Sequence, residues 1–160
     1  MTKPIILAGG SGFLGRRLAR TLTANSVPVV VLSRRPATTD PSGVTTVVWN
    51  GRDQGPWTAC LDGAAAVVNL VGKNVDCRYT PAARAEIDAS RVDSVRALDA
   101  ALLACPRPPP VLVQAASTAF YGDAGERPCA EDAPAGSGIP PDTCLRWEAA
   151  IAAMRAPVRT

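Results

Sequence analysis

Three glycines at a spacing of three residues form the pattern in this chain that is best suited to chemistry. They follow a short apolar run and open a segment with helical periodicity. In such a pattern the first glycine permits a tight turn, the second lets the backbone approach a ligand, and the third lets the helix pack near its strand. The free N–H groups at the start of the helix then attract an anion. The pattern predicts a turn that binds the pyrophosphate of a dinucleotide, through Gly9, Ser11, Gly12, Phe13, Leu14 and Gly15.

A second pattern lies at the end of the next apolar run, where the chain reads Ser33-Arg34-Arg35. An acidic residue at this position would hydrogen-bond the adenosine ribose of NAD. A guanidinium instead pairs with a 2′-phosphate through two charged hydrogen bonds, and it also stacks on adenine. The three residues therefore favour NADP(H) as the cofactor, with NAD as the alternative. Two simpler interpretations stay open, an ordinary glycine-rich turn and a solvated pair of arginines.

Other common catalytic arrangements are excluded by what the chain lacks. It has no histidine, so no Ser-His-Asp or Cys-His mechanism operates within it. Its five cysteines form no closely spaced pair, which argues against a metal site and favours free thiols. These cysteines are Cys60, Cys77, Cys105, Cys129 and Cys144.

The bulk composition indicates one globular domain. The chain has 160 residues, of which 47% are hydrophobic and 19% charged, and its formal net charge is only +3. This charge argues against a nucleic-acid protein that relies on a basic surface, although it would help to attract a phosphorylated ligand. No apolar run is long enough to span a membrane, and no secretory signal is recognisable. We therefore expect a cytoplasmic protein with no membrane and no nucleic-acid partner.

The elements that must position these residues alternate between apolar runs and helical patterns, which is typical of a parallel sheet covered by helices. We predict strands at residues 4–8, 27–32, 44–49, 64–71 and 111–116, and helices at residues 13–24, 81–105 and 143–154. In the first helix the expected apolar stripe is Phe13, Leu14, Leu18 and Leu22. In the second it is Ile87, Val92, Val95, Leu98 and Leu102. A loop at residues 122–141, rich in glycine and proline, is long enough to suggest a functional role.

Four segments give the chain a resemblance to the extended and atypical short-chain dehydrogenase/reductases, in the branch of NAD-dependent epimerases and dehydratases called epimerase family proteins. These segments are residues 9–15, 31–36, 67–72 and 115–122, and they occur in the family's order. The Ser90-Arg91-Val92 and Trp147-Glu148 segments also resemble that branch. The resemblance implies an α/β fold, a Rossmann-type doubly wound parallel sheet.

The same resemblance implies which residues surround the cofactor and the substrate. Ser117 corresponds to the serine that polarises the reacting oxygen of the substrate. The cofactor-binding residues that the resemblance adds are Asn69, Leu70, Val71, Gly72, Ala115 and Ala116. The family's usual Tyr-x-x-x-Lys pair is missing, because the corresponding region reads Pro140 to Glu148. Tyr121 is a substitute acid in one interpretation and a packed aromatic bonded to the backbone in the other. Arg78, Arg84 and Arg91 either meet an anionic substrate or face water.

The resemblance also implies a longer molecule. Members of the family continue into further strands and a substrate-binding region, so we expect residues 1–160 to be an incomplete NAD(P)-binding Rossmann domain, ending after about five strands where a sixth would begin. The exposed sheet edge would be covered by another copy of the chain or by a C-terminal region. Two functions follow: an NADP(H)-dependent oxidoreductase or epimerase acting on a small carbonyl or hydroxyl compound, such as a nucleotide sugar, and a dinucleotide-binding module without catalysis.

Overall fold

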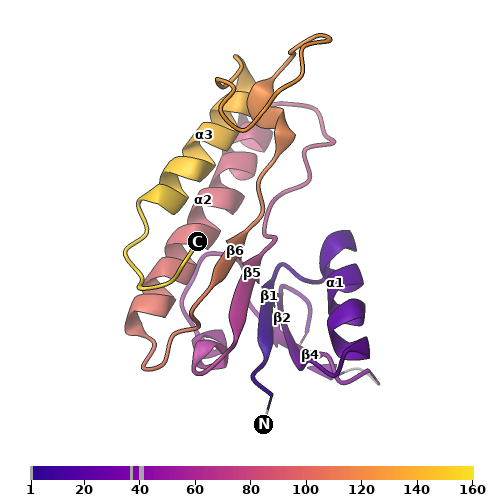
Figure 1. Cartoon of the computed structure of the whole chain (residues 1–160), viewed down its shortest axis with the longest axis vertical. Coiled ribbons are helices and arrows are strands. Elements are labelled where there is room, and N and C mark those ends of the chain that lie inside the picture. The colour runs from indigo at the N-terminus through magenta and orange to yellow at the C-terminus, as the bar shows by residue number, and fades with distance from the viewer. Residues whose placement is uncertain (1, 37, 40–41) are drawn as a thin grey trace.

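Strands and helices alternate along the chain in the computed structural model, which describes residues 2–36, 38–39 and 42–160 (Figure 1). The strands are β1 (Ile5–Ala8), β2 (Val29–Ser33), β3 (Thr38–Thr39), β4 (Thr45–Val48), β5 (Ala66–Asn69) and β6 (Leu112–Gln114). The helices are α1 (Phe13–Ala24), α2 (Pro81–Ala104) and α3 (Ile139–Ala152), with short 3₁₀ helices η1 (Pro56–Leu61) and η2 (Thr118–Tyr121). All five predicted strands and all three predicted helices are therefore present.

The strands form one sheet in the order β3-β4-β2-β1-β5-β6. All neighbours are parallel except β3, which pairs antiparallel with β4. Helix α1 lies on one face of this sheet, and α2 and α3 lie together on the other (Figure 1). The predicted doubly wound α/β fold is confirmed. The strand order reverses at β1, between β2 and β5, and open sheets of this kind bind ligands at the carboxyl ends of strands beside such a reversal.

A hydrophobic core covers each face of the sheet, because successive residues of a strand point to opposite sides. In β1, Ile6 and Ala8 pack toward the side of α2, whereas Leu7 packs toward α1. The larger core lies under α2 and includes the predicted Leu98 and Leu102. Of the predicted stripe on α2, Val92 alone is only half-buried. The central strands are thus fixed from both sides.

Helix α1 is rotated away from the predicted orientation. Phe13 is 81% exposed and Leu14 is 65% exposed, while Gly15 and Ala19 are the buried residues of this helix. The expected stripe was wrong at its first two positions, although Leu18 and Leu22 do pack against the core. The reason is the glycine at position 15, where the helix meets the backbone of the preceding turn. This contact aims Phe13 and Leu14 outward.

Two elements differ from the sequence prediction in extent. Helix α3 begins at Ile139 rather than at residue 143, with prolines in its first turn. Proline is tolerated there because the first N–H groups of a helix have no intrahelical partner. Strand β3 was not predicted, since two residues carry no readable periodicity. Within the described part of the chain, no helix is both long and apolar enough to cross a membrane.

The last residues of the chain return to the sheet beside β6. Arg159 forms a parallel bridge with Val111, and the amide of Leu112 donates to the carbonyl of Arg159 at 2.9 Å. The amide of Arg159 in turn donates to the carbonyl of Pro110 at 3.0 Å. The chain thus pairs with the segment that leads into β6 through this one isolated bridge.

Candidate functional site

A cleft of about 590 Å³ opens at the carboxyl ends of the strands, at the point where the strand order reverses. Its lining comes from five places: the glycine turn after β1, the end of β2, the loop after β4, the loop after β5, and one face of α2. The lining residues that the sequence predicted as site residues are Gly9, Ser11, Gly12, Ser33, Arg34, Leu70, Val71 and Gly72. The structure therefore brings together residues from three of the predicted segments.

The glycine turn has the geometry that its spacing predicts. Gly9 adopts a φ of +72°, and a Cβ there would lie 3.0 Å from the amide nitrogen of Val71. A Cβ on Gly15 would overlap the backbone of Gly10. A Cβ on Gly12, by contrast, would have only the carbonyl oxygen of Gly9 near it, at 3.7 Å. Gly12 caps α1 without any side-chain hydrogen bond to the helix amides. The turn is tight on its inner side and open toward the cleft.

A fourth glycine, Gly10, was not assigned a role by the sequence pattern. A Cβ there would lie 2.7 Å from the Cβ of Leu7 and 2.9 Å from its carbonyl oxygen. Gly10 is therefore required for the chain to leave β1 in this direction. The signal was available in the sequence as the doubled glycine after the strand.

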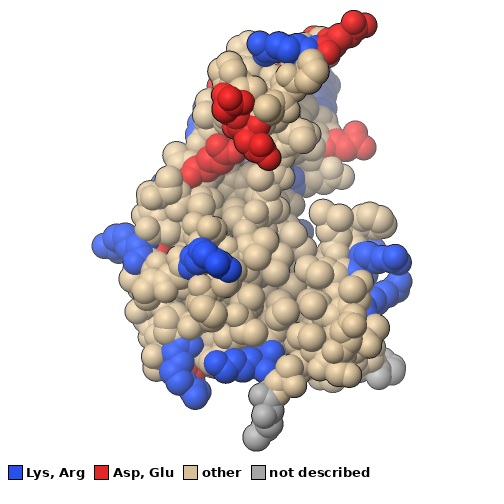
Figure 2. Space-filling model, viewed as in Figure 1, with Lys and Arg blue, Asp and Glu red and all other residues tan. Residues whose placement is uncertain are grey.

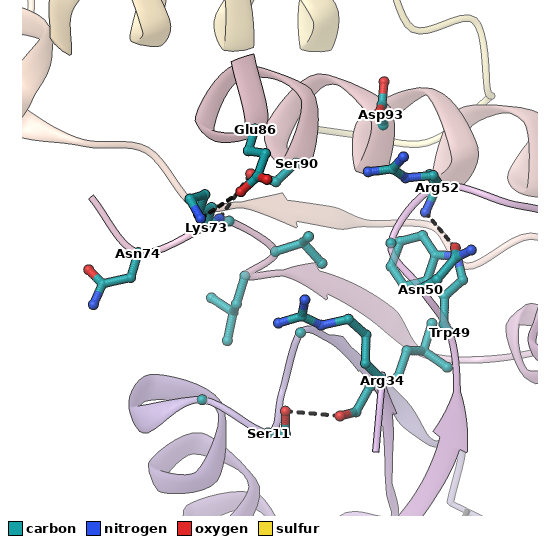
Figure 3. A pocket seen from close by; sticks show the side chains of 18 residues that line it. Ser11, Arg34, Trp49, Asn50, Arg52, Lys73, Asn74, Glu86, Ser90 and Asp93 are labelled. Carbon is teal, nitrogen blue, oxygen red and sulfur yellow. Dashed lines mark hydrogen bonds and ion pairs between the residues drawn. The ribbon is translucent and has the colours of Figure 1, made fainter. Parts of the chain in front are cut away.

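The end of β2 is joined to the glycine turn by a hydrogen bond. The hydroxyl of Ser33 donates to the hydroxyl of Ser11 at 2.9 Å and accepts from the amide of Arg35 at 3.1 Å. Ser33 is buried, so its role in this arrangement is to fix the strand end. Figure 3 shows the side chain of Arg34 extending from this point into the middle of the cleft. Arg35 is exposed and does not line the cleft.

The loop after β4 forms one end of the cleft, which the sequence reading did not identify. Its lining residues are Trp49, Asn50, Gly51 and Arg52 (Figure 3). The indole N–H groups of Trp49 and Trp57 both donate to the carbonyl of Asp53, at 3.1 and 2.9 Å. The side chain of Asn50 accepts from the amides of Arg52 and Asp53. The position of this loop after a parallel strand was a signal that could have identified it.

The loop after β5 forms the other end of the cleft, where Lys73 pairs with Glu86 of α2 at 2.6 Å (Figure 3). The hydrogen bond and charge of Glu86 raise the pKa of Lys73, and Lys73 lowers the pKa of Glu86 in the same way. Ser90 and Asp93 continue this lining along α2. These α2 residues carry no motif that sequence reasoning could connect to the cleft, since only the packing of the helix brings them there.

Asn69 has a structural role in this arrangement. Its side chain is completely buried and donates to Gln114 at 2.8 Å and to Ser94 at 3.2 Å. Its side-chain oxygen accepts from the amide of Val71 at 3.1 Å. The side chain thus ties β5 to β6 and α2 and orients the loop that lines the cleft, without lining the cleft itself.

We predict that Asn69→Ala lowers the free energy of unfolding by about 2 kcal/mol, because the partly buried Gln114 oxygen and the Val71 amide lose their partner. Urea unfolding followed by circular dichroism would measure this loss. Asn74→Ala is the matched control, since Asn74 is exposed and its side chain bonds the nearby Asp76 amide. We expect the control to change stability by less than about 0.5 kcal/mol. Equal stability of the two variants would contradict the role of Asn69.

The two residues predicted as catalytic lie outside the cleft lining. Ser117 is exposed at the start of η2, and its hydroxyl accepts from the amide of Ala119 at 3.2 Å. The hydroxyl of Tyr121 donates to the carbonyl of Ala130 at 3.0 Å, and its ring packs edge-on against Phe120. This is the backbone-bonded arrangement of the second interpretation of Tyr121. Ser117 also neighbours Cys144, whose thiol pKa is raised mainly by burial.

The remaining predicted residues are not part of the cleft lining. The amide of Ala115 donates to the carbonyl of Asn69 at 3.0 Å, and Ala116 is exposed. Of the arginines considered for an anionic substrate, Arg78 and Arg84 are exposed, whereas Arg91 is half-buried and bonded to backbone carbonyls.

In the described residues, no group of three or more histidine, cysteine, aspartate or glutamate side chains is arranged to hold a metal ion.

Charge is unevenly distributed over the face of the molecule seen in Figure 2. In Figure 2 the acidic side chains gather at the upper end, where the segment after β6 lies in Figure 1, and the basic side chains are most numerous over the lower half. That segment contains Asp123, Glu126, Glu131 and Asp132.

The family model and the related proteins that match this chain agree on one family. Residues 5–143 match the model of the NAD dependent epimerase/dehydratase family. The chain is 29% identical over 154 residues to the chloroplastic epimerase family protein SDR39U1 homolog of Arabidopsis thaliana, covering 90% of this chain and 43% of that protein. It is 30% identical over 128 residues to epimerase family protein YfhF of Bacillus subtilis, covering 80% of this chain and 42% of the relative.

Solved structures agree with these relatives. Human epimerase family protein SDR39U1 (isoform 2), determined with NADPH, superposes with a TM-score of 0.76 at 27% identity, covering 92% of this chain and 48% of that one. A short-chain dehydrogenase/reductase superfamily protein of Agrobacterium tumefaciens with bound NAD gives a TM-score of 0.74 at 25% identity, covering 92% and 44%. The chain thus spans a little under half the length of these proteins.

Proposed function

Since this chain belongs to the NAD dependent epimerase/dehydratase family, we propose that its cleft binds NADP(H). The pyrophosphate would lie at the glycine turn, beside the first amides of α1. The adenosine would extend over β2 and the loop after β4, with its 2′-phosphate beside Arg34. NAD(H) is the weaker ligand in this proposal.

The observation that carries the proposal is the side chain of Arg34, which extends from the end of β2 into the middle of the cleft (Figure 3). A guanidinium at this position offers paired N–H donors to a phosphate dianion. The turn beside it supports the same ligand, because Gly12 leaves open space and no side chain caps the helix amides. The human relative determined with NADPH is in agreement.

Calorimetric titration of the chain with NADPH and NADH tests this proposal. We expect NADPH to bind more tightly, by on the order of tenfold or more, because only NADPH offers a 2′-phosphate to Arg34. NADP⁺ and NAD⁺ should show the same preference. If none of the four dinucleotides binds, the proposed function is refuted. Equal affinities for the dinucleotides with and without the 2′-phosphate would refute the preference for NADP(H).

For the wider activity, we propose an oxidoreduction or epimerisation of a small carbonyl or hydroxyl compound, of which a nucleotide sugar is one possible class. The bound cofactor would supply or accept a hydride, and the Ser117 hydroxyl would donate a hydrogen bond to the reacting oxygen. Tyr121 is the candidate acid, provided that its hydroxyl leaves the carbonyl of Ala130. The chain spans less than half of its relatives, and a substrate region would complete this site.

A second candidate function is dinucleotide binding without turnover. It is favoured by the absence of a Tyr-x-x-x-Lys pair and by the hydrogen bonds that engage Ser117 and Tyr121 with the backbone. NADPH absorbance in the presence of a panel of small aldehydes, ketones and nucleotide sugars would separate the two functions. Substrate-dependent oxidation that Ser117→Ala reduces would support the enzyme. Tight binding without turnover would support the binding module for this chain.

A further inference from the structure

Lys73, which lines the cleft, is bonded to α2 through its amide, its carbonyl and its side chain. The amide of Lys73 donates to the hydroxyl of Ser90 at 2.9 Å, and the carbonyl of Lys73 accepts from the guanidinium of Arg91 at 3.3 Å. The ammonium of Lys73 pairs with Glu86. Ser90 and Arg91 both donate in addition to the carbonyl of Ile87, at 3.0 Å each. The helix therefore fixes both the backbone and the side chain of Lys73.

The guanidinium of Arg91 is itself held in place by α3 and by the loop. Its carbon lies 5.2 Å from the centre of the Trp147 ring, a cation–π distance, and the ring is 6% exposed. On its other side, a Cβ on Gly72 would lie 3.3 Å from the guanidinium carbon and one of its nitrogens. The two segments Ser90-Arg91-Val92 and Trp147-Glu148, 55 residues apart in the sequence, thus meet at the loop after β5.

This loop lies at the end of the cleft opposite to residues 49–52, the loop after β4 (Figure 3). Strand β5 adjoins β1 on the side away from β2, and the glycine turn contacts Leu70 and Val71. A dinucleotide whose pyrophosphate lies at the turn and whose adenosine lies over β2 must place its other nucleoside over β5. Residues 70–73 are therefore beside the nicotinamide riboside half, if the proposed function is correct.

We propose that Ser90 and Arg91 are positioning residues, which hold the backbone of Lys73 in the conformation that receives the nicotinamide riboside half of the cofactor. Neither residue needs to touch the cofactor for this role. Arg91 acts through a backbone carbonyl, and its planar group combines this hydrogen bond with stacking on Trp147. An ammonium group on a lysine stem cannot reproduce that combination. The inference rests on the proposed function, since it needs a bound dinucleotide.

The test compares two ligands that share the adenosine half. NADPH and adenosine 2′,5′-bisphosphate are titrated against the full chain and against Arg91→Met, which keeps an apolar stem over Trp147. We expect NADPH binding to weaken about tenfold, which corresponds to about 1.4 kcal/mol, whereas the bisphosphate changes by less than about twofold. Ser90→Ala should show the same selectivity with a smaller loss, and Arg91→Lys should recover part of the affinity. Arg84→Met, an exposed arginine of the same helix, is the matched control and should match the unmodified chain.

The outcomes are distinguishable. An unmodified chain that binds neither ligand refutes the proposed function and this inference together. Equal weakening of both ligands by Arg91→Met, with the fold intact by circular dichroism, indicates a general structural role and refutes the inference alone. Unchanged NADPH affinity in both Arg91→Met and Ser90→Ala also refutes it. If Arg91→Met does not fold, Ser90→Ala decides the question by the same comparison.

Discussion

Gly15→Ala is expected to destabilise the fold by about 3 kcal/mol and to abolish detectable NADPH binding. The added methyl group would overlap the backbone of Gly10, so either α1 or the turn must move. Neither side of this contact is a flexible side chain that can rotate away. Because α1 and the turn together form the pyrophosphate side of the cleft, stability and binding should fall together. Urea unfolding followed by circular dichroism and calorimetric titration with NADPH would measure the two losses.

Gly12→Ala is the matched control. In this variant we expect NADPH binding to weaken while stability is retained. Gly12 has a φ of −76°, which any residue adopts, and the nearest atom to an added Cβ is 3.7 Å away. We expect stability to change by less than about 0.5 kcal/mol. Binding of NADPH should nevertheless weaken by on the order of tenfold or more, because the methyl group points into the space that the phosphate must enter. Gly12→Ala binding as tightly as the unmodified chain would contradict a pyrophosphate at this turn.

Arg34→Ala is expected to remove the preference for NADPH. A hydrogen bond to a charged partner contributes about 1.5–3 kcal/mol, so NADPH affinity should fall on the order of 10- to 100-fold. The affinity for NADH should change by less than about threefold, since NADH has no 2′-phosphate on its adenosine ribose. Titration of both cofactors at one fixed salt concentration would measure the difference, because added salt screens an exposed charge.

Arg35→Ala separates a specific role of Arg34 from the general effect of positive charge. Arg35 is the adjacent residue with the same charge, but it does not line the cleft. We expect the preference for NADPH to persist in Arg35→Ala. If the two variants lose NADPH affinity equally, the arginines act only through the overall charge of this region, and the contact proposed for Arg34 is wrong.

The sequence was most informative where the structure depends on residues that are close together in the chain. The glycine triplet follows β1 and opens α1, and the positive φ of Gly9 and the close contact of Gly15 both result from this local pattern. The apolar run of β2 is buried on both faces as its composition predicted. Arg34 could be assigned to the cleft because the residue after a parallel strand lies at the edge where ligands bind.

The sequence was less informative where the neighbouring residues are compatible with two different environments for a side chain. Phe13 and Leu14 continue an apolar pattern, yet the contact between Gly15 and Gly10 turns them toward solvent. Arg91 has the spacing of a surface arginine, yet α3 covers it with Trp147. Ser33 and Asn69 stand in motifs that suggest ligand contacts, and their side chains are hydrogen-bonded within the protein.

The sequence alone thus determined the alternating α/β fold, the glycine turn and the position of Arg34, because each depends on a periodicity, a backbone conformation or a strand end within a few residues. Tertiary structure alone decided what surrounds them. The bond from Asn69 to Gln114 joins residues 45 apart in the sequence, and that from Arg91 to the carbonyl of Lys73 joins residues 18 apart. Such contacts depend on strand register and on the packing of α2 against the sheet, and no local pattern encodes these.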